Sequence, residues 1–216
     1  MRKINFLKSI KTQKRNINQR SSAKSKNIIQ ISRKYGKDYF DGKRDYGYGG
    51  YYYDGRWIKV AKYFQKKYKL KKGSKVLDVG CAKGFLIKDF IDLGIDAYGL
   101  EISDYAIKNS PKEVIGRIHK GNAKKLPFPD NSFDAVISIN TLHNLTKKEC
   151  EIALKEIQRV TKKNAFVQVD SYRNRKEKKI FESWVLTAKY HDFPKNWISL
   201  FKKVGYKGDY FWTLIS

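Results

Sequence analysis

The residues best suited to chemistry in this sequence lie in a short turn at positions 80–84. The apolar run at residues 76–79 is typical of a buried strand, and the pattern over residues 84–93 is typical of a helix. Glycine at Gly80 and Gly84 allows a tight turn and the close approach of a ligand. The free amides at the start of a helix suit an anionic or hydrogen-bond-accepting group. We therefore predict a nucleotide-type binding corner here.

A carboxylate follows the turn at a distance in the sequence that suits nucleotide binding. Residues 97–101 are predicted to form a second short strand, and its last residue, Glu101, lies about 20 residues beyond the turn. An acid at this place can accept hydrogen bonds from the hydroxyl groups of a ribose. The turn and the acid together are stronger evidence for nucleotide binding than the glycines alone.

Two more segments follow predicted strands, and ligands of parallel sheets bind beyond the carboxyl ends of the strands. In residues 140–144, His143 is a candidate general base because imidazole titrates near neutral pH; a histidine that lines a pocket or caps a helix is the alternative. In residues 170–174, Arg173 could bind a carboxylate or phosphate through two hydrogen bonds; a surface arginine in a basic run is the alternative. No cluster of His, Cys and Asp has metal-ligand spacing, so we expect no metal.

The elements that must position these residues alternate between strand and helix patterns. Further strands are predicted at residues 114–118, 133–139, 165–169 and 210–215. Further helices are predicted at residues 57–68, 103–110, 146–160, 175–189 and 194–204. Side chains of the 146–160 helix expected to face the core are Ile152, Leu154, Ile157 and Val160. This order predicts a parallel sheet with helices on both of its faces.

Residues 39–57 interleave tyrosine with glycine, which disfavours a regular helix. Such a loop could lay several rings over a pocket, where tyrosine faces attract a cation and tyrosine hydroxyls bind sugar oxygens. We predict that Tyr51, Tyr53 and Arg56 contact the substrate from this lid. The alternative is an aromatic surface loop that docks against the core.

The 216 residues suffice for one α/β domain with an extension. We expect a basic, flexible N-terminal arm at residues 1–37, a Tyr/Gly-rich lid segment with a leading helix at 38–70, and the catalytic domain at 71–216. No apolar run approaches the ~20 residues of a membrane span, and the N-terminus lacks the apolar core of a secretory signal. Two cysteines, Cys81 and Cys150, do not make a disulfide framework. We therefore expect a reduced, cytoplasmic protein.

The net charge is +26, and residues 1–37 contain twelve Lys or Arg and no Asp or Glu. A positive field of this size favours anionic partners such as RNA, phospholipid headgroups or sugar nucleotides. Nucleic-acid binding through residues 1–37 is one interpretation of the arm. A composition bias that enriches lysine throughout the chain is the other.

Taken together, the motifs of residues 55–216 resemble the class I methyltransferases that use S-adenosylmethionine. The run from Asp78 to Gly84 resembles their first motif, with Ala82 in place of the usual middle glycine. Residues 121–123, followed by the LPFPDNSFD run at 126–134, resemble the segment that precedes their fourth strand, with Asn122 where an acid is usual. A dinucleotide-binding Rossmann unit is the alternative, but its usual third glycine spacing is absent.

The resemblance implies a Rossmann-like fold with a mostly parallel seven-stranded sheet and S-adenosyl-L-methionine as cofactor. It implies that Glu101 binds the ribose, that Asn122 and Ala123 border the adenine, and that the loop of His143 faces the methyl group. The cofactor-binding residues expected from it are Asp78, Gly80, Cys81, Ala82, Gly84, Glu101, Ile102, Asn122, Ala123 and Asn140.

The predicted function is methyl transfer to a small polar acceptor, such as a sugar or sugar nucleotide of surface glycan synthesis, with His143 as catalytic base and Arg173 on the substrate. One alternative is an RNA methyltransferase that uses the basic arm. Another is a non-catalytic protein that binds the cofactor. A methyltransferase acting on adenine in DNA is disfavoured because residues 140–143 lack the Pro-Pro run that those enzymes share.

Overall fold

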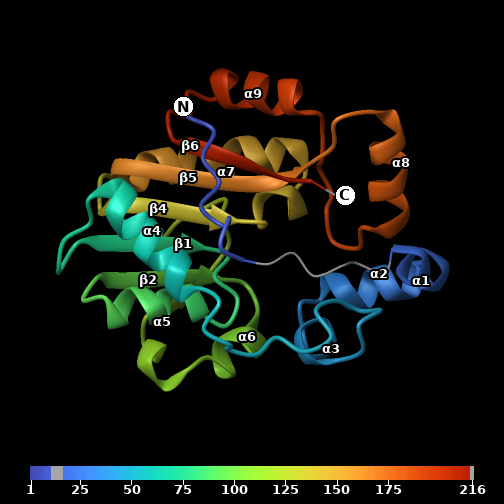
Figure 1. The fold of residues 1–216 in the computed structure, drawn as a ribbon, viewed down its shortest axis with the longest axis horizontal. Coiled ribbons are helices and arrows are strands. Elements are labelled where there is room, and N and C mark those ends of the chain that lie inside the picture. Colours follow the sequence, from blue (N-terminus) through green and yellow to red (C-terminus); the bar gives the residue numbers. More distant parts are fainter. Residues whose placement is uncertain (11–16, 215–216) are drawn as a thin grey trace.

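The computed structural model describes residues 1–10 and 17–214, and its centre is one six-stranded sheet in the order β3-β2-β1-β4-β5-β6 (Figure 1). Every pairing in this sheet is parallel. The strands are β1 Lys75–Val79, β2 Asp96–Glu101, β3 Ile118–Lys120, β4 Phe133–Ile139, β5 Thr161–Ser171 and β6 Asp209–Leu214. The predicted Rossmann-like α/β fold is confirmed. The described residues form six strands rather than seven, because only one strand, β6, follows β5.

Nine α-helices are present in the described part of the chain: α1 Ile17–Ala23, α2 Lys26–Arg33, α3 Lys37–Asp41, α4 Ile58–Tyr68, α5 Phe85–Asp92, α6 Asp104–Lys108, α7 Lys147–Val160, α8 Arg175–Trp184 and α9 Pro194–Lys203. Side chains fix several helix starts. The Ser103 hydroxyl accepts a hydrogen bond from the Ala106 amide, and Thr146 and Glu149 form a reciprocal capping box at α7. None of these helices is long and apolar enough to cross a membrane.

Two apolar cores lie on opposite faces of the sheet. One contains the inward residues of α7 and α9, with Trp197 and Leu154 fully buried. The other contains α4, α5 and the start of the chain, with Phe64 and Phe90 fully buried. Burying one such side chain contributes about 1.5–3 kcal/mol. Both faces of the parallel sheet are therefore covered, as such sheets require.

The start of the chain is packed rather than flexible. Phe6 is fully buried and stacks on Phe64, with ring centroids 3.8 Å apart. The Ile4 amide donates to the Tyr210 carbonyl at 3.0 Å, and the Arg2 guanidinium pairs with Asp209. The expectation of a flexible arm therefore does not fit residues 1–10, because two apolar side chains within this basic segment find places in the core. Residues 11–16 of that expected arm lie outside the described residues.

Three expected elements differ from the structure. Ile152 is 46% exposed, since the inward stripe of α7 runs through Ala153, Leu154 and Ile157 instead. Helix α8 ends at Trp184, and Val185 is already extended. The third strand begins only at Ile118, because residues 112–114 form a 3₁₀ turn.

Helices α1, α2, α3 and α8 lie beyond the carboxyl ends of the strands (Figure 1). We call residues 17–57 the roof. A small apolar cluster joins α1 to α8 through Ile17, Phe181 and Trp184. Within the roof, the Arg20 guanidinium donates hydrogen bonds to the carbonyl oxygens of Arg44 and Gly47, at 2.5 and 2.6 Å. These contacts hold the roof over the edge of the sheet at which parallel sheets bind ligands.

Candidate active site

The turn between β1 and α5 has the strained geometry of a binding corner. Gly80, Ala82 and Gly84 have φ angles of 80°, 51° and 77°, in the left-handed region that glycine prefers. The Leu100 carbonyl of β2 accepts hydrogen bonds from the amides of Gly80 and Cys81, at 2.7 and 3.2 Å. A Cβ atom at Gly80 would lie 2.2 Å from the side chain of Thr141. Only glycine fits this position without movement of its neighbour.

Glu101 ties the corner to the end of β2. Its carboxylate accepts hydrogen bonds from the amides of Ala82, Ile102 and Ser103, at 2.8, 2.8 and 2.9 Å. Burial raises the pKa of Glu101, although these three amides act in the opposite direction. Glu101 therefore stabilises the backbone of the corner, in addition to any contact with a ribose.

Asp78 lies behind the corner and is buried. Burial and the neighbouring Glu101 carboxylate raise the pKa of Asp78 to about 7. A buried carboxylate with this titration point changes charge near neutral pH, so a cationic ligand in the corner would favour its ionised form.

A cavity of about 340 Å³ opens between this corner and the roof, within the size range of about 300–1,000 Å³ that small-molecule sites occupy. It lies beyond the carboxyl ends of β1, β2 and β4, where the strand order reverses between β1 and β4. The predicted cofactor residues that line it are Gly80, Ala82, Glu101, Ile102, Asn122, Ala123 and Asn140. Asp78, Cys81 and Gly84 do not line it; they support the corner from behind.

Two asparagines in the wall have groups suited to a ligand. Asn140 has a φ of 54°, and its Oδ1 accepts a hydrogen bond from the Thr213 hydroxyl at 2.6 Å. Asn144 also lines the cavity, and its Oδ1 is buried with no hydrogen-bond partner in the described residues. A buried amide oxygen without a donor is unfavourable, so a ligand donor would stabilise it.

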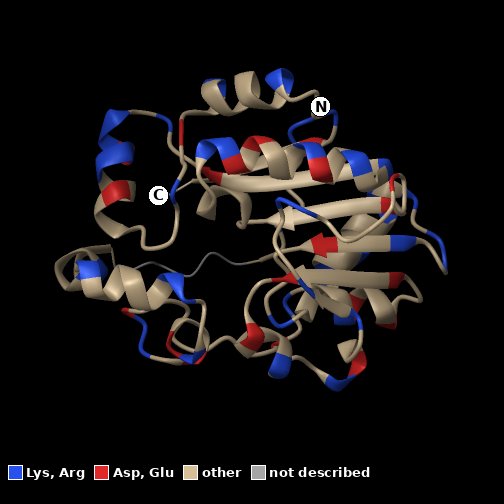
Figure 2. Cartoon of the chain, turned by 180° about the vertical axis from the view of Figure 1, so that it is seen from behind, with Lys and Arg blue, Asp and Glu red and all other residues tan. Residues whose placement is uncertain are grey.

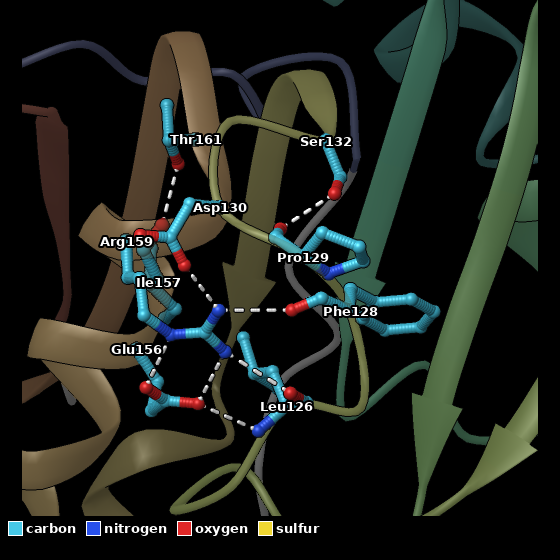
Figure 3. Close-up of polar contacts among 9 residues, drawn as sticks. All are labelled: Leu126, Phe128, Pro129, Asp130, Ser132, Glu156, Ile157, Arg159 and Thr161. Atoms are coloured by element: carbon cyan, nitrogen blue, oxygen red, sulfur yellow. Dashed lines mark hydrogen bonds and ion pairs between the residues drawn. The ribbon is translucent and has the colours of Figure 1, made fainter.

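The LPFPDNSFD run is held against α7 by one arginine (Figure 3). The guanidinium of Arg159 donates to the carbonyl oxygens of Leu126 and Phe128, at 3.1 and 2.9 Å, and pairs with Asp130 at 2.7 Å. Glu156 accepts from both the Leu126 amide and Arg159. The run therefore helps to fix the neighbouring wall, and its residues do not line the cavity.

The roof contributes Arg33, Tyr35, Tyr39, Phe40 and Tyr48 to the cavity. Arg33 and Tyr35 are not among the candidates named from the sequence, and the substrate residues predicted in the Tyr/Gly segment do not line this cavity. The left-handed φ of 50° at Tyr35, just beyond α2, is a feature that residue types do not disclose. Tyr48 is 41% exposed because its ring borders this open space.

The predicted substrate residues of the lid lie elsewhere. Tyr51 stacks on Phe85 with ring centroids 4.9 Å apart, and the Tyr53 hydroxyl donates to Asp89. Arg56 forms an ion pair with its near neighbour Asp54. None of the three lines the cavity, since each side chain already has a partner on the outside of the corner.

A buried ion pair connects roof and corner. Lys83 Nζ lies 2.6 Å from Asp41 Oδ2, and their side chains are only 6% and 14% exposed. Asp41 also accepts hydrogen bonds from the Tyr105 hydroxyl and the Tyr51 amide, at 2.7 and 3.0 Å. We call this group of contacts the latch. Because Lys83 belongs to the corner, the latch couples the position of the roof to the shape of the binding turn.

His143 does not face the cavity. Its Nδ1 accepts a hydrogen bond from the Asp170 amide at 3.1 Å, and its Nε2 lies 3.3 Å from the Asp170 carboxylate. Burial lowers the pKa of His143, so the ring is neutral with its proton on Nε2. Both ring nitrogens are engaged, an arrangement typical of a structural histidine.

Arg173 also lies outside the cavity. Its side chain is 61% exposed and pairs with Glu177 one helical turn away. No group of His, Cys, Asp and Glu in the described ranges could hold a metal ion.

Comparison with known proteins places this geometry in a class. Residues 77–169 match the family model described as a methyltransferase domain. The chain is 35% identical over 117 residues to a demethylmenaquinone methyltransferase of Geobacillus stearothermophilus, covering 50% of this chain and 49% of that protein. It is 32% identical over 143 residues to a tRNA (carboxymethyluridine(34)-5-O)-methyltransferase of Arabidopsis thaliana, covering 62% of this chain and 33% of that protein. The chain thus spans about half or less of the curated relatives it matches.

A solved structure shows the same fold. A SAM dependent methyltransferase from Archaeoglobus fulgidus superimposes with a TM-score of 0.55 at 19% identity, covering 68% of this chain and 67% of that one. Residues 77–169 therefore match a methyltransferase domain, and the sheet around them has the fold of a SAM dependent methyltransferase, so S-adenosylmethionine is the cofactor that this corner should hold. Gly80, Ala82 and Glu101 line the cavity, and the Asn144 oxygen in its wall lacks a donor among the described residues, which fits a ligand of this kind.

Proposed function

We propose that this chain transfers the methyl group of S-adenosylmethionine to a small polar acceptor. The observation that carries the proposal is one cavity of about 340 Å³ shared by the corner residues Gly80 and Glu101 and the roof tyrosines. The finer proposal, a sugar or sugar nucleotide as acceptor, is supported by Tyr35, Tyr39 and Tyr48, whose hydroxyls can bind sugar oxygens. It no longer has support from Tyr51, Tyr53 or Arg173.

The protein's task in such a reaction is alignment. The bound cofactor supplies a methyl group already activated by its cationic sulfur. The glycine corner and Glu101 would hold the sugar end of the cofactor, and Asn140 lines the same cavity. The roof orders the acceptor and excludes water, which favours an in-line approach to the methyl carbon.

RNA methylation is the second candidate. Its support is the net charge of +26 and the similarity to a tRNA methyltransferase. Figure 2 shows Lys and Arg on α8, α9 and several loops rather than on one surface, which favours composition bias over a dedicated RNA face. Removing residues 1–35 would not test this candidate cleanly, because Phe6 belongs to the core and Arg33 to the cavity. Replacing the exposed Lys176 and Lys179 of α8 by Gln is the better test.

The deciding experiment supplies methyl-labelled cofactor with a cell extract divided into RNA, protein and small-molecule fractions. Labelled product in the small-molecule fraction supports the proposal, and label in RNA that falls in the α8 double variant and at high salt supports the rival. Calorimetry measures cofactor binding in parallel. Cofactor binding without any labelled product would favour the non-catalytic alternative.

A further inference from the structure

Among the residues that the structure describes, the ionisable side chains that line the cavity include none suited to remove a proton at neutral pH. They are Arg33, Tyr35, Tyr39, Tyr48, Glu101, Lys124, Glu149 and Lys189. Burial raises the pKa of Tyr35 and Tyr39, so both stay neutral donors, and the phenol of the exposed Tyr48 is also uncharged at neutral pH because phenols titrate at about pH 10. The hydrogen bond from Lys124 and those from Thr146 lower the pKa of Glu149 to about 2. Glu101 is occupied by three backbone amides.

The three histidines of the chain do not fill this role. The nitrogens of His143 are engaged by Asp170, behind the wall. His191 packs against Tyr172, and His119 lies on β3 against Phe128. None of them lines the cavity. A neutral hydroxyl would therefore meet no base here, although an alcohol needs one to react efficiently.

Two cations on the cavity wall are left without an internal counter-charge. Arg33, from α2, and Lys189, from the segment after α8, make no side-chain hydrogen bond or ion pair with any residue the structure describes. Lys124 differs, since its Nζ lies 2.5 Å from Glu149. The wall thus carries three cations against two carboxylates, and the cofactor itself adds a net positive charge. Arg33 and Lys189 are both exposed to solvent at this wall, where an anionic ligand would find a complementary charge.

We propose that the acceptor is a small organic acid whose ionised oxygen is the nucleophile, with Arg33 and Lys189 binding its negative charge. The inference rests on the proposed methyltransferase function and names its substrate class, and it replaces the neutral hydroxyl of a sugar by an ionised oxygen as the atom that is methylated. The acceptor oxygen forms a bond to the methyl carbon, the carbon–sulfur bond breaks, and its electron pair stays on sulfur. The anion and the cationic sulfur become a neutral product and a neutral thioether group, so no proton has to move. A carboxylate would give a methyl ester, and an acidic enol or phenol would give an ether.

The first test separates the small molecules of an extract into acidic and neutral fractions by anion exchange before reaction with methyl-labelled cofactor. We expect the labelled product to arise from the acidic fraction and to have lost a negative charge. Mild alkali then distinguishes the two sources, because an ester releases labelled methanol and an ether does not. Label only in neutral compounds, or only in RNA or protein, overturns the inference while methyl transfer stands. No labelled product at all contradicts the proposed function and this inference with it.

The second test uses Arg33→Gln and Lys189→Gln, with Lys34→Gln and Lys195→Gln as matched controls at exposed lysines outside the cavity. Each cavity variant should raise KM for the acidic acceptor by about 10- to 100-fold, as expected for the loss of one charged hydrogen bond. Cofactor affinity measured by calorimetry should stay within about threefold. Calorimetry with the acid recovered from the labelled product should show the same loss of affinity in the two variants. An unchanged affinity for that acid in both variants would overturn the assignment of Arg33 and Lys189.

Discussion

The floor and the roof of the cavity are built by different kinds of contact. The floor, which follows β1, β2 and β4, is fixed mainly by backbone amides near the ends of these strands. The Gly80 amide donates to the Leu100 carbonyl, and the Ala82 amide donates to the Glu101 carboxylate. The roof is fixed by side chains that reach across the chain. Asp41 meets Lys83, and the Ser103 hydroxyl donates to the Tyr35 carbonyl at 2.5 Å.

This difference suggests a division of labour. The matched methyltransferase domain, residues 77–169, contains the floor and none of the roof residues 17–57. The relatives that share this domain are named for acceptors as different as a quinone and a tRNA. We infer that the floor serves the shared cofactor and that the roof is the part that selects the acceptor. The following predictions test that separation.

The largest effect is expected from the latch. Asp41→Asn leaves the Lys83 ammonium buried without a counter-charge, and breaking a buried pair in this way costs about 3–5 kcal/mol. The free energy of unfolding, measured with urea, should fall by about 3 kcal/mol, toward the lower bound because the amide can still accept hydrogen bonds. The matched control is Asp54→Asn, which breaks an exposed pair with Arg56 and should cost less than about 1 kcal/mol. Equal effects of the two variants would mean that the latch does not stabilise the roof.

A floor variant should act on the cofactor instead. Gly80→Ala places a Cβ atom 2.2 Å from the Thr141 side chain at a φ of 80°, so strain and overpacking together should cost about 2–4 kcal/mol. Calorimetry should show a loss of cofactor affinity of about 100-fold. Gly73→Ala is an informative control, because Gly73 has a φ of 79° but its Cβ would meet nothing within 4 Å. If both variants bind the cofactor equally well, the corner is not the binding turn.

The same contrast explains what could be predicted from the sequence. The corner and Glu101 could be predicted because a strand, a turn and a helix that are adjacent in the chain define them. Parallel pairing then aligns Val79 of β1 with Leu100 of β2. The fold class followed from the alternation of strands and helices.

The structure of the roof could not be predicted in this way. Its contacts join residues such as Tyr35 and Ser103 that are distant in the chain, and no periodic pattern marks them. Residue type alone also misled, since Tyr51 and Tyr53 are as aromatic as Tyr39 but pack outside the cavity. His143 was chosen for its titration range, and the sequence could not show that its Nδ1 accepts a hydrogen bond from the Asp170 amide.

A pH effect should distinguish the floor from the rest of the molecule. The pKa of Asp78 is raised from 3.8 to about 7, so its contribution to the free energy of unfolding is fully present below pH 3.8 and is lost as pH rises through about 7. A cationic ligand prefers the ionised carboxylate, so cofactor affinity should rise about tenfold between pH 6 and 8. Asp78→Asn should bind more weakly, with a flat pH profile. Asp89→Asn, which alters a buried acid outside the cavity, should keep the wild-type profile; a flat wild-type profile would remove Asp78 from cofactor binding.

The smallest effect is expected at His143, which belongs to neither surface of the cavity. In His143→Asn the shorter amide can still accept the hydrogen bond from the Asp170 amide, so the wall beside Asn140 should keep its shape. We expect the turnover rate to change by less than about threefold, whereas loss of a general base lowers it by about 10²–10⁴-fold. Cofactor affinity should also remain unchanged. A turnover rate lowered about 100-fold with unaltered stability would restore His143 as the base, and it would also undermine the inference that the acceptor arrives already ionised.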